Sequence, residues 1–387
     1  MQAKLFRSGI YCASGGGLLW ATPPLNGAAP GYPYRQGRYF YPLSGRFGIS
    51  CGVLLRILLW VAIGALPKAA ATQNPHFSQS WMSPLQLNPA TTGLGDWDAR
   101  TGVHAKNQWA SVPVAYQTFA AFYDQKIQAP RIPVKGFSVG GYFLHDRAGD
   151  SRLRWTQVSL SLAWQRTFDQ QHTIALGVGM DAGQRAFRTD MLALGDQYNG
   201  EFFDPNLSSA EVWDKPNDGF VSFHVGGLYA WKAWRSRSQI NAGLAAGHLN
   251  RPTIGFSEGV GTPLPMWFRL HAQGVVEATD DWDVVAQGHV FRQGQYQEGL
   301  LAVGGCYHWQ RPEEVIRLGA HIGYRVGDAF IGYIDARWKN WLATLSYDVN
   351  TSPFAVATNG RGGLEFSLHR FLFQPKPPET FKSCPIF

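Results

Sequence analysis

Residues 158–164 read "VSLSLAW", in which serines separate the apolar residues Val158, Leu160 and Leu162. Side chains that alternate between apolar and polar every second residue indicate a β-strand with one apolar face, because a helix repeats every 3.6 residues. The same period returns in "TIALGVGMD" at 173–181 and in "VSFHVGGLYAW" at 221–231. No convincing amphipathic helix interrupts the pattern after residue 93, so we predict an all-β protein.

Two architectures share this alternation. A soluble sandwich buries its apolar face in a core, whereas an outer-membrane barrel turns that face to lipid and fills its inside with small and polar residues. The alternating segments often reach 10–13 residues, longer than the ~5–6 residues of most soluble strands. Their polar faces are rich in Gly, Ala and Ser and include the ionisable residues Asp181, His224, Asp335 and Arg337. Aromatic residues such as Trp97 gather at segment ends, as an interfacial girdle requires, and these features favour the barrel.

We therefore predict a transmembrane antiparallel β-barrel of about 14 strands with an N-terminal plug-like segment, located in the outer membrane. The expected strands are 97–109, 113–126, 134–145, 154–165, 171–182, 218–232, 236–248, 267–277, 281–292, 295–309, 314–325, 328–339, 341–349 and 362–373. The longest gaps are 183–217 and 249–266. Bacterial barrels keep their short turns on the periplasmic side, so we expect these two gaps to be loops outside the cell.

The first 71 residues contain seven Lys or Arg and no Asp or Glu. Without them the chain has 27 Lys and Arg against 27 Asp and Glu, so the net charge of +7 does not indicate a nucleic-acid-binding surface. Residues 54–71, "LLRILLWVAIGALPKAAA", combine a basic residue, a short apolar run and a small-residue end. This is the pattern of a secretory signal, which we place at 53–71 after a leader at 1–52 that is disordered or wrongly assigned. The alternative is a buried helix or an uncleaved anchor.

Three motifs are candidate sites of chemistry or binding. "GFSVG" at 136–140 matches the G-x-S-x-G nucleophile pattern, but Ser138 falls in the middle of an expected strand and not at a strand–turn–helix elbow. "TDDWD" at 279–283 lies between two strands and is expected to be a solvated hairpin turn, not a cation site. The aromatic residues of "GDQYNGEFFDPNLSS" at 195–209 either bind a partner or fold back to plug the barrel. We expect no catalytic residue and no enzymatic activity.

The cysteines and histidines do not predict a metal site. Outside the leader only Cys306 and Cys384 remain, without a C-x-x-C or Cys/His cluster. Whether the two form a disulfide is open. His224 and His369 are expected to face the barrel interior, where a hydrogen-bond network explains them without a metal. We expect no cofactor.

The stretch that precedes the first strand resembles the start of the PorP/SprF family of the type IX secretion system of Bacteroidetes. Members open with D-P-x-F-S/T-Q, continue with N-P-x-x-x-N-P-A-x-x-G, and carry a basic residue near Q-W. Here the matching residues are Pro75, Phe77, Ser78, Gln79, Pro84, Asn88, Pro89, Ala90, Gly93, Gln108 and Trp109. Asn74 and Ser83 depart from the pattern.

The end of the chain is similar to the family's S-Y-D-x-N-x-S-x-L…GG-x-E-x-S-L ending and C-P tail. It reads "LSYDVNTSPFAVATNGRGGLEFSL" from Leu345 and closes with "CPIF". The candidate partner-binding residues that the resemblance marks are Pro75, Phe77, Ser78, Gln79, Asn88, Pro89, Gly93, Gln108, Trp109, Tyr347, Asp348, Asn350, Gly363 and Glu365.

The resemblance implies a non-enzymatic outer-membrane barrel that holds or displays a secreted, adhesin-like surface protein, in gliding bacteria for motility. It implies two partners, the C-terminal sorting domain of a secreted protein and a periplasmic peptidoglycan-binding protein. The expected organisation is a family-motif segment at 72–96, in the periplasm or inside the barrel, then the barrel at 97–373 and a tail at 374–387. The alternative function is an outer-membrane channel or hydrophobic-substrate transporter, whose lumen should carry rings of charge.

Overall fold

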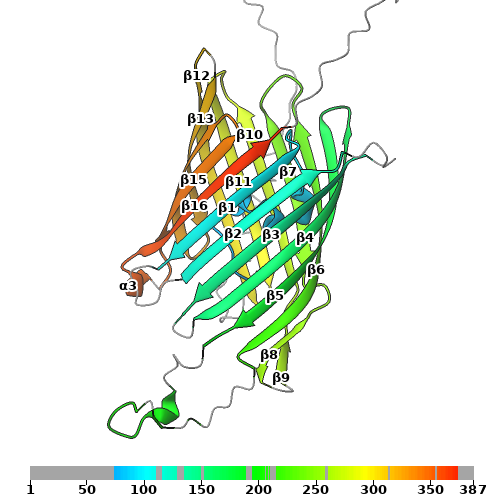
Figure 1. Cartoon of the computed structure of the whole chain (residues 1–387). Helices are drawn as coiled ribbons and strands as arrows, with labels where there is room; N and C mark the ends of the chain where they lie inside the picture. Colours follow the sequence, from blue (N-terminus) through cyan, green and yellow to red (C-terminus); the bar gives the residue numbers. More distant parts are fainter. Residues whose placement is uncertain are drawn as a thin grey trace, which may run out of the picture. The chain divides into compact units, whose positions relative to one another are not determined.

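The computed structural model describes residues 74–109, 116–128, 135–149, 152–188, 194–204, 206–207, 209, 215–257, 260–312, 314–353 and 355–373. The predicted leader, signal peptide and C-terminal tail lie outside these residues. Within them, fourteen strands form a closed barrel (Figure 1). They are β1 (Ala99–Gln108), β2 (Tyr116–Lys126), β3 (Phe137–Ala148), β4 (Leu153–Phe168), β5 (His172–Ala186), β6 (Asn217–Lys232), β7 (Gln239–Gly247), β10 (Trp267–Glu277), β11 (Trp282–Gln293), β12 (Tyr296–Gln310), β13 (Val315–Arg325), β14 (Ala329–Trp338), β15 (Trp341–Asn350) and β16 (Arg361–Leu372).

Each barrel strand pairs antiparallel with its neighbours, and the last strand closes on the first. The β1–β16 pairing runs from Ala99 opposite Leu372 to Gln108 opposite Gly363. We call this pairing the seam. Closure leaves no strand edge, which a barrel in lipid requires because an unpaired backbone group costs several kcal/mol there. The predicted fold class, a closed antiparallel barrel of 14 strands, is confirmed.

The register turns the apolar face of the strands outward. On β4, Val158 and Leu160 are 50% and 58% exposed, whereas Ser159 and Ser161 are buried inside. Trp155 shares the inward face, as its position in the alternation requires, and its ring packs on Phe220 at 5.1 Å. The soluble sandwich is excluded, because the apolar face is the outer one.

The two ends of the barrel differ. β1 begins and β16 ends at one of them, which we call the terminal end, and connections there are as short as 169–171 and 339–340. The opposite end, the loop end, also has the short connection 294–295, but it alone carries the long connections 187–216 and 248–266. An unexpected hairpin, β8 (Thr253–Ser257) and β9 (Val260–Pro263), projects there (Figure 1). The shorter elements η3 (Gly195–Gln197) and α3 (Ala355–Thr358) lie in loop-end connections as well.

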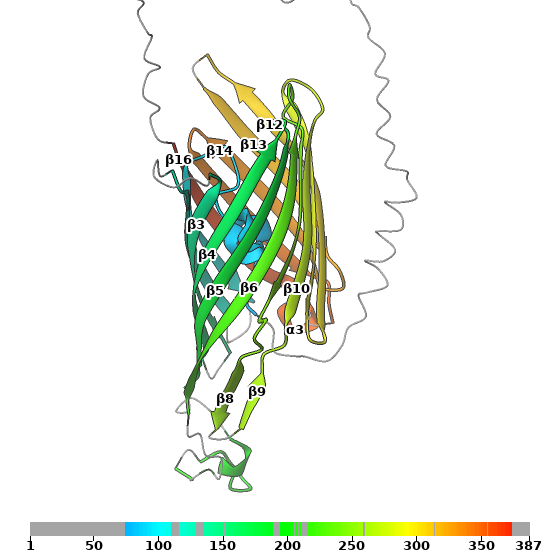
Figure 2. The ribbon, with the colours of Figure 1, turned by 90° about the vertical axis from the view of Figure 1, so that its right-hand side faces the viewer.

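Residues 74–98 form a chain that we call the lumenal segment, because it lies inside the barrel (Figure 2). There it contacts inward-facing side chains of the wall. It contains η1 (Ser80–Met82), α2 (Pro84–Leu87) and η2 (Pro89–Thr91). Pro84 and Pro89 each begin a helical turn, where a missing N–H costs no hydrogen bond. Asn88 caps η2 by accepting the N–H of Ala90 at 2.9 Å. The prediction that this segment acts as a plug stays a prediction.

Trp97 was expected in an aromatic girdle, and this is wrong. Its ring packs on Phe371 at 4.9 Å, and the guanidinium of Arg100 lies 4.8 Å from the ring centroid. Both contacts place the indole at the terminal mouth of the lumen. Among the described residues, no helix is long and apolar enough to span a membrane.

Candidate functional site

The buried carboxylate of Glu365 fixes the beginning of the lumenal segment to the seam. It accepts the backbone N–H groups of Ser78 and Gln79 at 2.8 and 2.9 Å. Lys106 Nζ and His104 Nε2 lie 3.2 and 3.4 Å from the same carboxylate. Hydrogen bonds and a cationic partner together offset the large cost of burying a charge. Because Lys106 is on β1 and Glu365 on β16, the segment is tied to both strands that close the barrel.

A second buried charge pair adjoins the first. Asp348 Oδ2 accepts the hydroxyl of Ser78 at 2.7 Å and Nη2 of Arg325 at 2.5 Å, and Nη1 of Arg325 donates to Ser78 Oγ at 2.9 Å. The neighbouring amide of Gln79 donates to Ser346 Oγ at 2.8 Å. The segment thus supplies polar groups to side chains of β13, β15 and β16 in a place remote from water. The second oxygen of Asp348, Oδ1, makes no hydrogen bond among the described residues.

Glycines on the opposite wall make room for the middle of the segment. A Cβ added at Gly177 would lie 2.4 Å from the backbone nitrogen of Ala90, and one at Gly226 would lie 2.0 Å from Asn88 Oδ1. Asn88 Nδ2 lies 3.1 Å from His271 Nε2 on β10. The barrel wall is therefore shaped to the backbone of the segment, since real Cβ atoms do not approach so closely.

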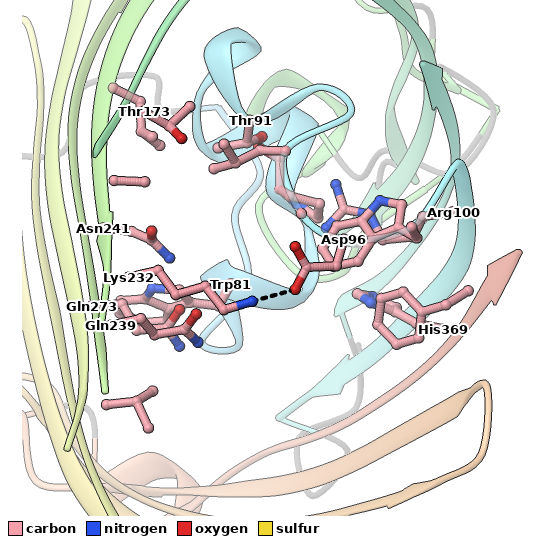
Figure 3. Close-up of a pocket in the computed structure, with 18 of the residues that line it drawn as sticks. Trp81, Thr91, Asp96, Arg100, Thr173, Lys232, Gln239, Asn241, Gln273 and His369 are labelled. Atoms are coloured by element: carbon pink, nitrogen blue, oxygen red, sulfur yellow. Dashed lines mark hydrogen bonds and ion pairs between the residues drawn. The ribbon is translucent and has the colours of Figure 1, made fainter. Parts of the chain in front are cut away.

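A cavity of about 1520 Å³ lies between the lumenal segment and the terminal end. Asn241, Gln239 and Gln273 line one wall, and Arg100 and His369 line the wall opposite (Figure 3).

The end of the lumenal segment runs along this cavity to the terminal end, where the chain enters β1. Gly93 donates its N–H to Asp124 at 2.7 Å, and Asp124 also pairs with Arg100 at 2.8 Å. Near the mouth, Asp96 pairs with Lys232 at 2.5 Å (Figure 3). Charged and amide groups that face an open space can bind a polar ligand or a polypeptide, so this cavity is a second candidate site.

The structure brings five of the residues marked by the family resemblance into one buried cluster. Ser78, Gln79, Asp348 and Glu365 make the contacts described above, and Phe77 stacks on His104 at 3.7 Å. Asn88, Pro89 and Gly93 lie farther along the segment. Pro75 accepts a hydrogen bond from Gln86 through its carbonyl at 2.8 Å.

The remaining marked residues lie elsewhere. Gln108 and Gly363 face each other across the seam. The backbone N–H of Trp109 donates to the carbonyl of Gly362 at 2.7 Å. Asn350 donates to Thr358 at the loop end, whereas Tyr347 faces outward. A partner-binding role for any of these residues stays a prediction.

Lys106, His104 and Arg325 complete the cluster and were not among the marked residues. Ser346 also belongs to the cluster and is the serine of the family-like S-Y-D motif. Lys106 could have been found, because the family carries a basic residue near Q-W and Lys106 precedes Gln108 by two positions. No signal pointed to Arg325, since only the β13–β15 arrangement places it beside Asp348.

The other sequence motifs are parts of the barrel. Ser138 is buried as the second residue of β3, not in the middle of a strand as expected. Gln165 Nε2 donates to its hydroxyl at 3.1 Å, and β3 continues from it as a strand and not as a helix, so the residue is not at a nucleophile elbow. His224 Nδ1 lies 3.2 Å from Asp181, and His369 Nε2 lies 3.0 Å from the carbonyl of Met82. Both histidines belong to the interior network that was expected for them.

The prediction that residues 279–283 form a solvated turn is wrong for the last residue. Asp283 belongs to β11, is buried, and pairs with His308 at 2.6 Å and Arg237 at 3.0 Å. Cys306 is a buried free thiol, and Cys384 lies outside the described residues. Their pairing stays open.

The loop end carries exposed aromatic side chains. Tyr198, Phe202 and Phe203 are 56%, 58% and 42% exposed, although a backbone bridge joins Tyr198 to Phe203. These rings therefore do not fold back into the lumen. Exposed aromatic groups of this kind are a candidate surface for a protein partner.

A closed antiparallel barrel with an apolar outer face and a polar interior defines the class of outer-membrane β-barrel proteins. Within this class the chain belongs to the PorP/SprF family of type IX secretion system membrane proteins, whose family model matches residues 69–369. The protein is therefore a type IX secretion protein of the outer membrane, and its family and fold are those of a secretion-system barrel and not those of an enzyme.

Solved structures with a similar barrel share little sequence with this chain. A KdgM porin has 8% identity and a TM-score of 0.31, over 71% of this chain and 99% of that one. A FadL homologue of Pseudomonas aeruginosa has 11% identity and a TM-score of 0.43, over 74% and 93%. CdiB from Escherichia coli has 12% identity and a TM-score of 0.43, over 72% and 64%. A comparison with curated proteins found no match.

Proposed function

We propose that this barrel holds a secreted, adhesin-like surface protein at the outer membrane and links it to a periplasmic peptidoglycan-associated protein. In this proposal the barrel is an anchor without catalytic activity and not a conduit for solutes. The observation that carries it is the contact between the lumenal segment and the seam, where Glu365 and Asp348 hold Ser78 and Gln79.

The charges of the lumen support an anchor over a channel. A channel needs charged groups that face a continuous water path, whereas Glu365, Asp348 and Lys106 are buried and bonded to each other or to the segment. A transporter of hydrophobic substrates needs an apolar path, and the buried interior of β16 instead carries Glu365, Ser367 and His369. We infer that the lumenal segment closes the barrel to free diffusion.

The two ends of the barrel suit two different partners. Barrels of this class keep their short connections in the periplasm, so the terminal end and its cavity face the periplasmic protein in this proposal. The loop end then faces outward and presents Tyr198, Phe202 and Phe203 to the sorting domain of the secreted protein. Aromatic side chains provide large contact area, and they are enriched where proteins bind one another.

Affinity purification of the tagged barrel from outer membranes tests the proposal. We expect the wild-type protein to retain a secreted protein that carries a type IX sorting domain and a peptidoglycan-binding protein. A Tyr198→Ser, Phe202→Ser variant should lose the secreted protein and keep the periplasmic one. Val356→Ser is the matched control, because Val356 is also at the loop end and 87% exposed but lies outside the aromatic group.

Planar-bilayer recordings decide between anchor and channel. We expect the wild-type barrel to conduct little, and a variant that lacks residues 75–93 and still folds to conduct strongly. Recovery of neither partner, together with strong conductance of the wild-type barrel, would favour the channel.

A further inference from the structure

Three inward-facing side chains on neighbouring strands form a cluster that the proposed function does not use. Cys306 on β12, His321 on β13 and Asp335 on β14 each offer one ligand atom, and these atoms lie within 4.8 Å of one another. All three residues line the wall of the cavity at the terminal end. A thiol, an imidazole and a carboxylate are the groups that zinc-type cations prefer in proteins.

The strand register explains how the cluster forms. Cys306 is opposite Gly319, and Gly319 is opposite Asp335, so Cys306, Gly319 and Asp335 make one row across β12, β13 and β14. His321 is two residues beyond Gly319 on the same face of β13. The glycine leaves a gap in the middle of the row, and the carboxylate of Asp335 fills it. A Cβ at Gly319 would lie 2.0 Å from Asp335 Oδ2 and 2.9 Å from His321 Nε2. Any other residue at 319 would therefore disrupt the arrangement.

The imidazole of His321 is held by one nitrogen and leaves the other available. Nε2 lies 2.7 Å from Asp335 Oδ2, and the other oxygen of Asp335 accepts from Arg317 at 2.7 Å. Nδ1 is buried and makes no hydrogen bond among the described residues. It points toward β12, because a Cβ added at Gly304 would lie 2.3 Å from it. Cys306 is two residues farther along the inward face of that strand.

We propose that Cys306 Sγ and His321 Nδ1 bind a zinc-type divalent cation at the wall of the terminal cavity. Asp335 acts as the positioning carboxylate that accepts Nε2–H and so fixes the tautomer of the metal-binding imidazole. Metal-bound histidines commonly donate their other ring N–H to a carboxylate, a backbone carbonyl or water in this way. Binding releases the thiol proton of Cys306, because the thiolate is the ligand. The remaining coordination positions face the cavity, where water or a side chain of a bound protein completes them. This site does not depend on the proposed function.

The ligand atoms, and not the net charge of the surroundings, give the site its affinity for a cation. Arg317 pairs with Asp335. Arg337 is opposite Arg317 in the register and lines the same cavity, so the two arginines balance Asp335 and the ionised thiol. A thiolate selects zinc-type cations over magnesium and calcium, which prefer oxygen ligands.

Cobalt titration of the full barrel in detergent tests the site, because a thiolate bound to Co²⁺ gives a charge-transfer absorption in the near ultraviolet. We expect the wild type to bind one Co²⁺ per barrel with this band and to release it to excess Zn²⁺. Cys306→Ser should abolish the band, whereas Cys384→Ser, the matched control, should keep it. Asp335→Asn should keep the band but weaken binding about 10-fold or more.

Two results would overturn the site, namely a wild-type barrel without the band and a Cys306→Ser barrel that retains it. If Cys306→Ser does not fold, thiol protection replaces it. In the Cys384→Ser background, Zn²⁺ should slow the alkylation of Cys306 by a small uncharged maleimide, and Mg²⁺ should not. Equal alkylation rates with Zn²⁺ and Mg²⁺ would contradict the proposal.

Discussion

The carboxylate of Glu365 accepts the backbone N–H of Ser78 at 2.8 Å, across 287 residues of sequence. The contact joins the two family-like motifs, one before the first strand and one in the last. Both motifs also meet Lys106 on β1. Closure of the barrel and capture of the lumenal segment therefore depend on the same buried charges.

Glu365→Gln should destabilise the barrel strongly. The variant leaves the Lys106 ammonium buried without a carboxylate, and breaking a buried ion pair from one side costs about 3–5 kcal/mol. We expect a lower midpoint of guanidinium unfolding for the barrel in detergent, followed by tryptophan fluorescence. The control is Asp169→Asn, since Asp169 is exposed and 3.9 Å from His172, and such exposed pairs contribute about 0–1 kcal/mol. Equal midpoints for the two variants would show that the buried pair is not required.

Gly177→Ala should displace the lumenal segment. The new methyl group would lie 2.4 Å from the backbone of Pro89 and Ala90, which cannot move aside as a flexible side chain could. Overpacking of this kind costs about 1–3 kcal/mol. We expect higher conductance than wild type in planar bilayers. Gly332→Ala is the matched control, because an added Cβ there meets nothing within 4 Å. Unchanged conductance in a folded Gly177→Ala barrel would mean that the segment does not close the lumen.

The barrel itself could be predicted from the sequence, because lipid on one side and a polar lumen on the other impose a strict two-residue period. That period placed Ser159 inside and Leu160 outside. It puts Trp155 on the inward face unless a bulge intervenes, and the register of β4 has no bulge there. The hairpin β8–β9 was missed, because short strands outside the membrane are free of this constraint. Trp97 was misplaced, since a tryptophan at the end of a strand can face the lipid interface or the mouth of the lumen.

The sites were only partly predictable. The family motifs marked Ser78 and Glu365 but not their contact, because long-range side-chain contacts depend on register and on the path of the segment inside the barrel. The cluster of Cys306, His321 and Asp335 has no sequence signature at all. Its members are 14 or more residues apart along the chain and come together through the pairing of three strands around Gly319.

Trp155→Ala should destabilise the barrel more than the loss of a tryptophan at the outer surface. Trp155 is 3% exposed, packs on Phe220, and lies 4.7 Å from the guanidinium of Arg185. Removing a buried tryptophan costs about 3–5 kcal/mol. Trp282→Ala removes an exposed ring that pairs with Tyr307, and such a pair contributes about 1 kcal/mol. The measurement is the unfolding midpoint of each variant in the same detergent, and we expect the lower midpoint for Trp155→Ala. A lower midpoint for Trp282→Ala would contradict the inward position of Trp155.

Asp348→Ala and Trp109→Ala should impair barrel assembly or partner retention more than Ser138→Ala does. Asp348→Ala removes the acceptor that Ser78 and Arg325 share, and the neighbouring Asp328 keeps only part of the pairing of Arg325. Trp109→Ala removes an indole that packs on Tyr116 at 4.9 Å beside the seam.

Ser138→Ala is mild by comparison, because Gln165 Nε2 keeps its second hydrogen bond, to the carbonyl of Gly93 at 3.0 Å. The measurement is the amount of folded barrel in the outer membrane, from its heat-modifiable electrophoretic mobility, together with the secreted protein that co-purifies with it. We expect wild-type values for Ser138→Ala and reduced values for the other two variants. If all three variants match the wild type in both quantities, the family-like motifs contribute neither to assembly nor to display.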